Sequence, residues 1–177
     1  PPQNISLKKM IEYNIYLSYN FLIYAFKRGV KNFFLIGSSY ENQIAKQTIS
    51  SEMSCYAITK YTLFLMFSAF AKENNIKLIY CKLPNIYGEG QYKNNLWPSL
   101  KYAAINNLDF IIKNKDTIRD FLSVEKAKRA IVDLISFDNM DSGTILEFDI
   151  IGKKKTIFEF SSHFWKEWGA EGKIKLK

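Results

Sequence analysis

The fold is decided by residues 31–39, which read KNFFLIGSS. This apolar run is short and has no polar alternation, which is typical of a strand that is buried on both faces. A helix is predicted over 7–28, because apolar residues recur there at helical spacing and Gly29 supplies a stop. Helix, glycine turn and buried strand form the second half of a βαβ unit, so the pattern predicts a parallel sheet.

Predicted strands and helices continue to alternate after this unit. We expect further helices at 55–74, 97–107, 124–137 and 156–168, and strands at 76–83, 108–112 and 144–150. Irregular segments are expected at 40–54, 84–95 and 113–120. Alternation of strand and helix over this length indicates an α/β protein.

The composition is that of a globular protein with a basic surface. The 177 residues are 47% hydrophobic and 24% charged, with a net charge of +8. A net positive charge favours an anionic partner, such as nucleic acid, an acidic membrane surface or a phosphorylated small molecule. The densest basic run, Lys153–Lys155, is predicted to be a turn, and no arginine-rich stripe supports nucleic-acid binding. The longest apolar run, residues 63–71, is shorter than the roughly 20 residues of a membrane span.

Cysteine and histidine are too few for a disulfide framework or a metal site. Cys55 and Cys81 are predicted to be two buried, reduced thiols of a cytoplasmic protein. The single histidine, His163, lies in no metal-ligand spacing, so no metal is expected.

Tyr56, Lys60 and Ser38 are the candidates for chemistry. Tyr56 and Lys60 are four residues apart on a predicted helix, so their side chains share one face. An ammonium beside the phenol favours the phenolate and would lower the pKa of Tyr56 toward the range of a general acid or base. Ser38 ends a buried strand, where open α/β sheets bind their ligands.

Each of these residues also has a plain structural interpretation. A Tyr-x-x-x-Lys pair is expected by chance in a chain with eleven tyrosines and this much lysine, and it would then be an ordinary helix-surface pair. Ser38 by itself is equally well interpreted as a helix cap or a turn residue.

Four motifs in a fixed order carry a resemblance to a known family. They are the strand ending in Ser38, the pair Tyr56 and Lys60, the segment LPNIYGEGQ at 83–91, and RDFLSV at 119–124. Together they resemble the extended short-chain dehydrogenase/reductase family of nucleotide-sugar epimerases, dehydratases and 4-reductases. The resemblance runs from about Asn14 to Gly169. It implies a Rossmann-like doubly wound parallel sheet, of which the C-terminal half is present, plus part of a small α/β substrate-binding domain.

The resemblance implies roles for the residues of the reaction centre. Tyr56 would be the acid/base, and Lys60 would hold the nicotinamide ribose and lower the pKa of Tyr56. Ser38 would hydrogen-bond the sugar oxygen at C4. Ser39 would bind substrate, and it would replace Ser38 if the register were shifted by one.

Four further residues match positions around that centre. Asn14 matches an asparagine beside the active site, and Pro84 lies on the stretch that approaches the nicotinamide. Asn85 and Arg119 match residues that bind the substrate diphosphate, a task that suits a planar guanidinium. Their structural interpretations are a turn former for Asn85, a strand stop for Pro84 and an ion pair with Asp120 for Arg119.

The resemblance also implies domains, a cofactor and partners. Residues 1–88 would be the remaining part of a Rossmann-like catalytic domain. Residues 89–177 would be mainly substrate-binding, with some segments returning to the Rossmann sheet. The implied cofactor is NAD or NADP and the implied substrate is a nucleotide sugar, with no nucleic-acid or membrane partner.

Helices 7–28 and 55–74 carry more apolar residues than one sheet face needs, which suggests a second buried surface, and the resemblance implies a homodimer through these helices. The excess residues include Phe64, Met66, Phe67 and Phe70. The alternative is that a missing half of the sheet covers part of that face.

The sequence departs from the family most clearly in lacking a Gly-x-x-Gly-x-x-Gly turn. We therefore expect roughly the first 75–90 residues of a typical Rossmann half to be missing, and the 177-residue stretch alone to be an inactive fragment. Lys82 stands where an arginine is usual, and Gln43-Ile44 stand where Tyr-Gly is usual.

The residues after the active-site serine bear on the subclass. Dehydratases carry Asp-Glu directly after the hydroxyl residue, whereas Ser39-Tyr40 follows here, which argues against a 4,6-dehydratase. The short loop is similar to that of CDP-sugar 4-reductases of the abequose or paratose type. An epimerase and a catalytically inactive relative remain alternative interpretations.

Overall fold

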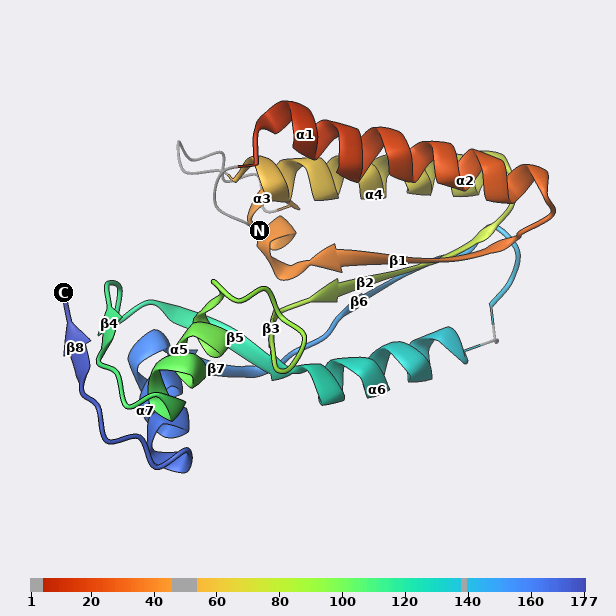
Figure 1. Ribbon diagram of the computed structural model, residues 1–177. Helices are drawn as coiled ribbons and strands as arrows, with labels where there is room; N and C mark the ends of the chain where they lie inside the picture. Colours follow the sequence, from red (N-terminus) through yellow and green to blue (C-terminus); the bar gives the residue numbers. More distant parts are fainter. Residues whose placement is uncertain (1–4, 46–53, 138–139) are drawn as a thin grey trace. The chain divides into compact units, whose positions relative to one another are not determined.

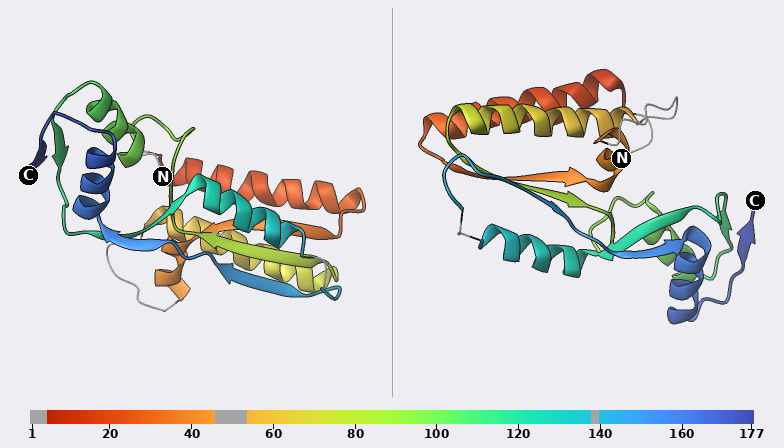
Figure 2. Two further views of the ribbon diagram at one scale, coloured as in Figure 1. Left: turned by 90° about the horizontal axis from the view of Figure 1, so that it is seen from below. Right: turned by 180° about the vertical axis from the view of Figure 1, so that it is seen from behind.

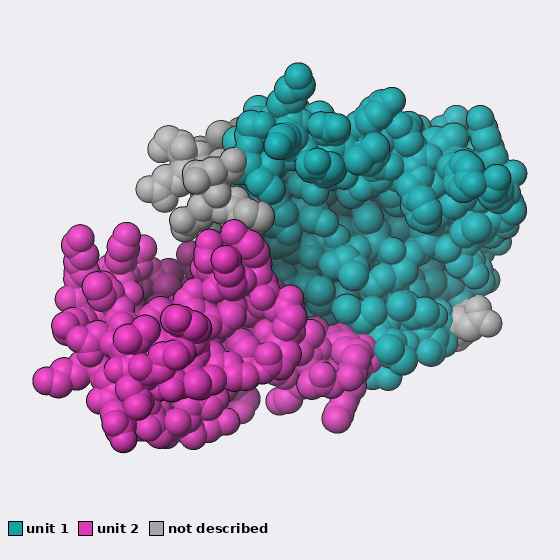
Figure 3. All heavy atoms as spheres, in the orientation of Figure 1, with its two compact units in different colours: residues 1–83, 130–150 teal, residues 84–129, 151–177 magenta. Residues whose placement is uncertain are grey.

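The computed structural model describes residues 5–45, 54–137 and 140–177 (Figure 1). The chain forms two compact units (Figure 3). The first comprises residues 1–83 and 130–150, and the second comprises residues 84–129 and 151–177.

A three-stranded parallel sheet is the centre of the first unit. Its order is β1 (Asn32–Ser38), β2 (Lys77–Leu83) and β6 (Ile145–Asp149). In register, Ile36 pairs with Cys81, which pairs with Phe148. The predicted parallel α/β architecture is thus confirmed. β1 lies at the edge of the described sheet, so Ile36 is exposed and the strand is less buried than its apolar sequence predicts.

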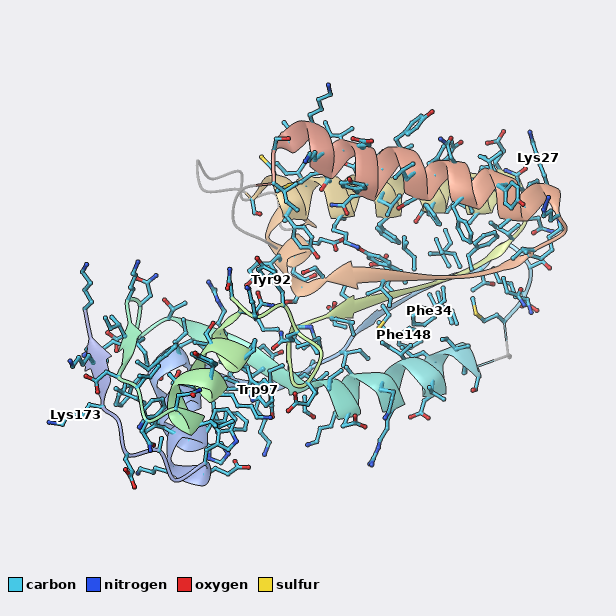
Figure 4. The ribbon with its side chains drawn as sticks, viewed as in Figure 1. Lys27, Phe34, Tyr92, Trp97, Phe148 and Lys173 are labelled. Carbon is cyan, nitrogen blue, oxygen red and sulfur yellow. The ribbon has the colours of Figure 1, made fainter. Side chains whose placement is uncertain are left out.

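Helices cover one face of this sheet, as three views show (Figures 1 and 2). α1 (Leu7–Ile11), the π-helical segment η1 (Glu12–Leu17) and α2 (Ser18–Lys27) form one continuous rod beside α4 (Cys55–Glu73). Their shared core consists of Leu22, Leu63, Phe67, Ala71, Ile76 and Leu78. The predicted helix at 7–28 is therefore present, with one π-helical turn inside it. Phe34 and Phe148 lie on the opposite face of the sheet (Figure 4).

The apolar residues that were expected to form a second surface are mostly used inside the unit. Phe64 and Phe67 are each 6% exposed, and Phe70 makes an edge-to-face contact with Phe26. That expectation is wrong for these side chains, because this side of α4 packs on the sheet and on α2. The exposed apolar residues of the helical layer lie elsewhere and include Tyr16, Leu17, Phe21, Tyr24 and Leu65.

The second unit contains two small sheets and two helices. One sheet has the order β3 (Asn85–Tyr87), β5 (Ile118–Ser123) and β7 (Lys153–Thr156), with β3 parallel and β7 antiparallel to β5. The other elements are α5 (Leu96–Ile105), α7 (Ile157–Glu167) and the parallel pair β4 (Phe110–Ile112) and β8 (Ile174–Leu176). Leu100, Ala103, Ala104 and Trp165 form its core. Helix α6 (Val124–Ile135) begins in this unit and ends in the first.

Several short elements differ from the predictions. β3, β5, β7 and β8 lie outside the predicted strands, with β5 beginning in the segment predicted to be irregular at 113–120, and Lys153–Lys155 form part of β7 rather than a turn. Lysines are favoured on a sheet-edge strand, where they discourage pairing with other chains. Part of the segment predicted to be irregular at 40–54 is helical, in η2 (Ser39–Glu41) and α3 (Asn42–Ala45). Residues 46–53 of it lie outside the described residues.

The prediction of two buried thiols is half right. Both cysteines are free, with Cys81 buried in β2 and Cys55 exposed at the first position of α4. The sequence around Cys55 does not show whether another element covers the start of its helix, so its exposure could not be predicted.

Candidate functional site

The candidate reaction centre lies in the first unit, where β1 ends and α4 begins. Ser38 is the last residue of β1, and Tyr56 and Lys60 occupy the first two turns of α4. The carboxyl end of a parallel strand is the usual place for ligand-binding groups in open α/β sheets. The structure therefore brings together three residues that the sequence separates by up to 22 positions.

A hydrogen bond joins the Ser38 hydroxyl to Tyr56. Ser38 is buried, whereas Ser39 is half-buried, and the hydrogen bond to Tyr56 comes from Ser38. This geometry favours Ser38 over its neighbour as the hydroxyl that acts with the tyrosine.

The pKa of Tyr56 differs in direction from the prediction. Burial raises it, and the carboxylate of Glu41 raises it further, while the hydrogen bond with Ser38 opposes both effects. Lys60 is not among the groups that shift this pKa, and its Nζ donates to the backbone oxygen of Ile36 at 3.0 Å. The direction of the Tyr56 pKa is therefore opposite to the predicted lowering by Lys60.

Lys60 is a half-buried cation with hydrogen-bonding capacity left over among the residues that the structure describes. Burial lowers its pKa, and the nearby Glu41 carboxylate acts in the opposite direction. An ammonium carries three donors, and the bond to Ile36 uses one of them. The remaining donors are suited to hydroxyl oxygens, such as those of a ribose.

Asn14 reaches the same turn of α4 from the π-helical segment η1. Its Nδ2 donates to Thr59 Oγ1 at 3.0 Å, and the Thr59 hydroxyl donates to the backbone oxygen of Tyr56 at 3.0 Å. π-helical turns are rare and are often found at functional sites. The structure thus places Asn14 beside the predicted reaction centre, in agreement with the motif comparison.

Glu41 is a member of this cluster that the sequence analysis missed. Its carboxylate accepts the backbone N–H of Ser38 at 2.5 Å and the hydroxyl of Tyr80. It is 1% exposed, and burial raises its pKa, against the lowering effects of the bonds to Tyr80 and Ser38. The spacing Ser38-x-x-Glu41 is that of a capping box, a sequence signal that could have drawn attention to this residue.

The remaining predicted site residues belong to the second unit. Pro84 is its first residue, and Asn85 in β3 donates to the backbone oxygen of Asp120 at 3.3 Å. Asn85 pairs in register with Phe121, and Arg119 pairs with Lys155. Because residues directly opposite in a sheet share a face, Asn85, Arg119 and Lys155 lie on the same face.

A cavity of about 370 Å³ opens beside this sheet within the second unit. Aromatic and basic side chains dominate its lining, which includes Tyr87, Phe121, Lys126, Lys153, Lys155, Phe160, His163 and Phe164. Apolar walls with a few convergent charges are typical of sites for small molecules, and the charges here are positive.

Comparison with known families decides the class of the chain. The sequence model of the NAD dependent epimerase/dehydratase family matches residues 2–147. The chain belongs to this family. No curated protein sequence matches it.

Solved structures of other proteins share the fold at low identity. UDP-glucuronic acid 4-epimerase from Bacillus cereus, in complex with NAD, is 17% identical with a TM-score of 0.80, covering 100% of this chain and 60% of that one. UDP-glucose 4-epimerase from Thermotoga maritima, with UDP-glucose, is 20% identical with a TM-score of 0.77, covering 98% and 61%. RMD from Pseudomonas aeruginosa, complexed with NADPH, is 17% identical with a TM-score of 0.76, covering 98% and 66%. The chain thus spans about three fifths of the length of these proteins.

The described residues contain neither a membrane-spanning helix nor a metal-binding cluster. Across residues 5–45, 54–137 and 140–177, no helix has the length and apolar character needed to cross a membrane. Within those same ranges, no three or more His, Cys, Asp and Glu side chains are grouped so that they could hold a metal ion.

Proposed function

We propose that the protein is an NAD(P)-dependent oxidoreductase or epimerase acting at C4 of a nucleotide-linked hexose, with Tyr56 as the acid/base. The observation that carries this proposal is the hydrogen bond between Ser38 and Tyr56 at the carboxyl end of β1, with Lys60 one turn further along α4. Membership of the epimerase/dehydratase family supports the class of reaction.

NAD or NADP is the proposed cofactor. The donors left on the Lys60 ammonium fit ribose hydroxyls, and Tyr56 lies one turn away on the same helix. Pro84 is assigned to the nicotinamide side on the strength of its motif. When bound, the nicotinamide supplies or accepts a hydride at C4 of the sugar. Relatives of the same fold have been solved with NAD and with NADPH.

The chain's own residues handle the proton in this scheme. The Ser38 hydroxyl holds the oxygen at C4 and orients it toward Tyr56. The Tyr56 phenol gives a proton to that oxygen when C4 is reduced and takes one when C4 is oxidised. Lys60 fixes the ribose, while Asn14 and Ser39 are the proposed substrate contacts nearest this centre.

The proposed substrate is a nucleotide diphosphate sugar. Asn85 and Arg119 share a face of the β3–β5–β7 sheet with Lys155, which supports a diphosphate site there. In this proposal the first unit is the Rossmann-like catalytic part, and the second is mainly substrate-binding. A relative of the same fold has been solved with UDP-glucose.

Replacing Tyr56 by phenylalanine tests the proposal directly. We expect Tyr56→Phe to lower kcat of the intact protein by at least about 100-fold, the scale of losing a general acid/base. Tyr16→Phe is the matched control, because Tyr16 is 62% exposed and lies in the same helical layer. Turnover of Tyr56→Phe close to that of the parent would defeat the assignment.

A 4-reductase of the CDP-sugar type is the second candidate. The short segment between Ser38 and Tyr56, and Ser39-Tyr40 in place of Asp-Glu after the serine, support it. Assays with a 4-keto sugar nucleotide plus NADPH, and with a 4-hydroxy sugar nucleotide plus NAD, distinguish reductase from epimerase. NADPH binding by fluorescence without turnover in either assay would indicate a catalytically inactive relative. The same assays on the 177-residue stretch alone test whether it is an inactive fragment.

A cytoplasmic homodimer through α1–η1–α2 and α4 completes the proposal. Exposed apolar side chains on this layer, Phe21 at 65% and Tyr24 at 56% among them, support a covered face. Sedimentation analysis of the intact protein should show a dimer that Phe21→Asp converts to a monomer. Ile151→Asp, at an exposed apolar position of the second unit, should leave the dimer intact. A monomeric parent protein would contradict the dimer.

A further inference from the structure

Thr59 is a buried polar residue to which the proposed reaction gives no role. It lies in α4 beside Lys60 and one turn after Tyr56, and it is 2% exposed. A hydroxyl taken out of water costs free energy unless it forms hydrogen bonds. Thr59 Oγ1 accepts from Asn14 Nδ2 at 3.0 Å, and the same hydroxyl donates to the backbone oxygen of Tyr56 at 3.0 Å. Both of its partners are therefore residues of the candidate site.

The backbone fixes the order of donors and acceptors in this short chain of hydrogen bonds. The carbonyl oxygen of Tyr56 can only accept, so the single hydroxyl hydrogen of Thr59 lies between these two oxygens. Thr59 Oγ1 then has only lone pairs to offer to its other neighbour. A side-chain amide has a donor group at one end and an acceptor oxygen at the other. Asn14 must accordingly turn its donor, Nδ2, toward Thr59.

The acceptor end of the Asn14 amide is left for a ligand. Asn14 is half-buried, and no residue that the structure describes donates a hydrogen bond to its Oδ1. An amide oxygen accepts hydrogen bonds and cannot donate them. The ligand group that suits this position is therefore a donor, and the donors of a hexose or a ribose are hydroxyl groups.

Helix packing alone does not account for the pair of Asn14 and Thr59. Replacing both partners of a buried hydrogen bond by apolar groups of the same shape can be nearly neutral for stability. The π-helical segment η1, which carries Asn14, packs against α4. π-helical turns are rare and occur frequently at functional sites. The bond thus joins an unusual helical turn to the helix that carries Tyr56 and Lys60.

We propose that Thr59 is a positioning residue, which holds the Asn14 amide so that its oxygen accepts a hydrogen bond from a hydroxyl group of the ligand. Thr59 acts through Asn14 and does not itself bind the ligand. The inference rests on the proposed function, in which Asn14 contacts the substrate. The hydroxyl belongs either to the hexose or to the ribose of the cofactor, and the experiment separates these two sources.

Exchange of the Asn14 side-chain amide protons with water tests the orientation without substrate or cofactor. The measurement is ¹⁵N NMR of the intact protein labelled at asparagine, with Asn14→Ala assigning the signal. Thr59→Val keeps the branched shape and removes the hydroxyl, so exchange should become about threefold to tenfold faster, the factor that corresponds to one net hydrogen bond. Thr59→Ser keeps the hydroxyl and should stay within about twofold of the parent. Thr62→Val, the same chemical change at a half-buried position of α4, should leave the exchange unchanged.

Steady-state kinetics of the same variants tests the role of this orientation in binding. Thr59→Val should raise one KM by about threefold to tenfold and change kcat by less than about twofold, because a binding contact is weakened. Thr59→Ser should restore that KM. The KM of the nucleotide sugar rises if the hydroxyl belongs to the hexose, and the KM of the cofactor rises if it belongs to the ribose. In Asn14→Ala, which lacks the amide, adding Thr59→Val should have no further effect.

Three results would overturn the inference. They are unchanged amide exchange in Thr59→Val, a lower kcat with neither KM altered, and an additive loss in the double variant. Thr59→Ala takes the place of Thr59→Val if the valine variant does not fold. An inactive parent protein would defeat the proposed function, whereas the amide exchange, which needs no turnover, would still decide whether Thr59 orients Asn14.

Discussion

Adding one methyl group at Gly37 should destabilise the first unit far more than a surface change would. The Cβ of Gly37→Ala would overlap the hydroxyl and Cζ of Tyr80 and would lie 2.7 Å from its Cε2. Favourable carbon–carbon contacts begin at about 3.5 Å. Tyr80 cannot withdraw easily, because it is 1% exposed and stacked on Phe64.

The expected cost combines three effects. Overpacking a well-packed interior costs about 1–3 kcal/mol. Moving Tyr80 also weakens its bond to the Glu41 carboxylate, and hydrogen bonds to charged groups contribute about 1.5–3 kcal/mol. Alanine is favoured over glycine within a strand by about 0.5–1 kcal/mol, which offsets part of the loss. We expect the free energy of unfolding to fall by about 2–4 kcal/mol.

Urea denaturation of the intact protein, followed by circular dichroism, measures this change. Tyr80→Val provides the control background, because a valine side chain does not extend across Gly37. In that background Gly37→Ala should cost less than about 1 kcal/mol. A loss below about 0.5 kcal/mol in the parent, or equal losses in both backgrounds, would refute the packing argument.

Three further predictions follow from polar contacts. Burial raises the pKa of Glu41 above its ordinary 4.5, so the native state holds this proton more tightly and its free energy of unfolding falls as pH rises from 4.5 through the native pKa. The stability of Glu41→Gln relative to the parent should therefore increase across that window in urea titrations, and a constant difference would contradict this. Trp165→Phe loses the bond from Nε1 to the Gly172 oxygen at 3.0 Å, and should cost about 1–2 kcal/mol in the same assay. Lys82→Met removes an ammonium 3.2 Å from Asp149, and its cost of about 0.5–1 kcal/mol should shrink in 1 M salt, since that carboxylate is half exposed.

Local sequence patterns were sufficient for the larger elements. The helical spacing of apolar residues over 7–28 and 55–74 predicts the rod α1–η1–α2 and helix α4. The buried run at 31–37 predicts β1 and, with the preceding helix, a parallel sheet. These predictions succeed because periodicity is set by neighbours within one or two turns of chain.

Short strands and a buried charge could not be predicted in the same way. β3 and β8 are three residues long, and β7 carries three consecutive lysines, so none has a periodic pattern. Each becomes a strand only through pairing with a segment distant in sequence. Glu41 resembles an ordinary surface acid until Tyr80, 39 residues away, is placed against it.

The sequence by itself determined the order of motifs, and with it the membership of the epimerase/dehydratase family and the candidates Ser38, Tyr56 and Lys60. It also determined that helix and strand alternate. The motifs and this alternation both depend on the spacing of residues that are close together in the sequence. Only the tertiary structure decided the direction of the Tyr56 pKa, since burial raises that pKa and the Glu41 carboxylate raises it further. Burial and the distances between charges set a pKa, and both arise only when β1, β2 and α4 are packed together.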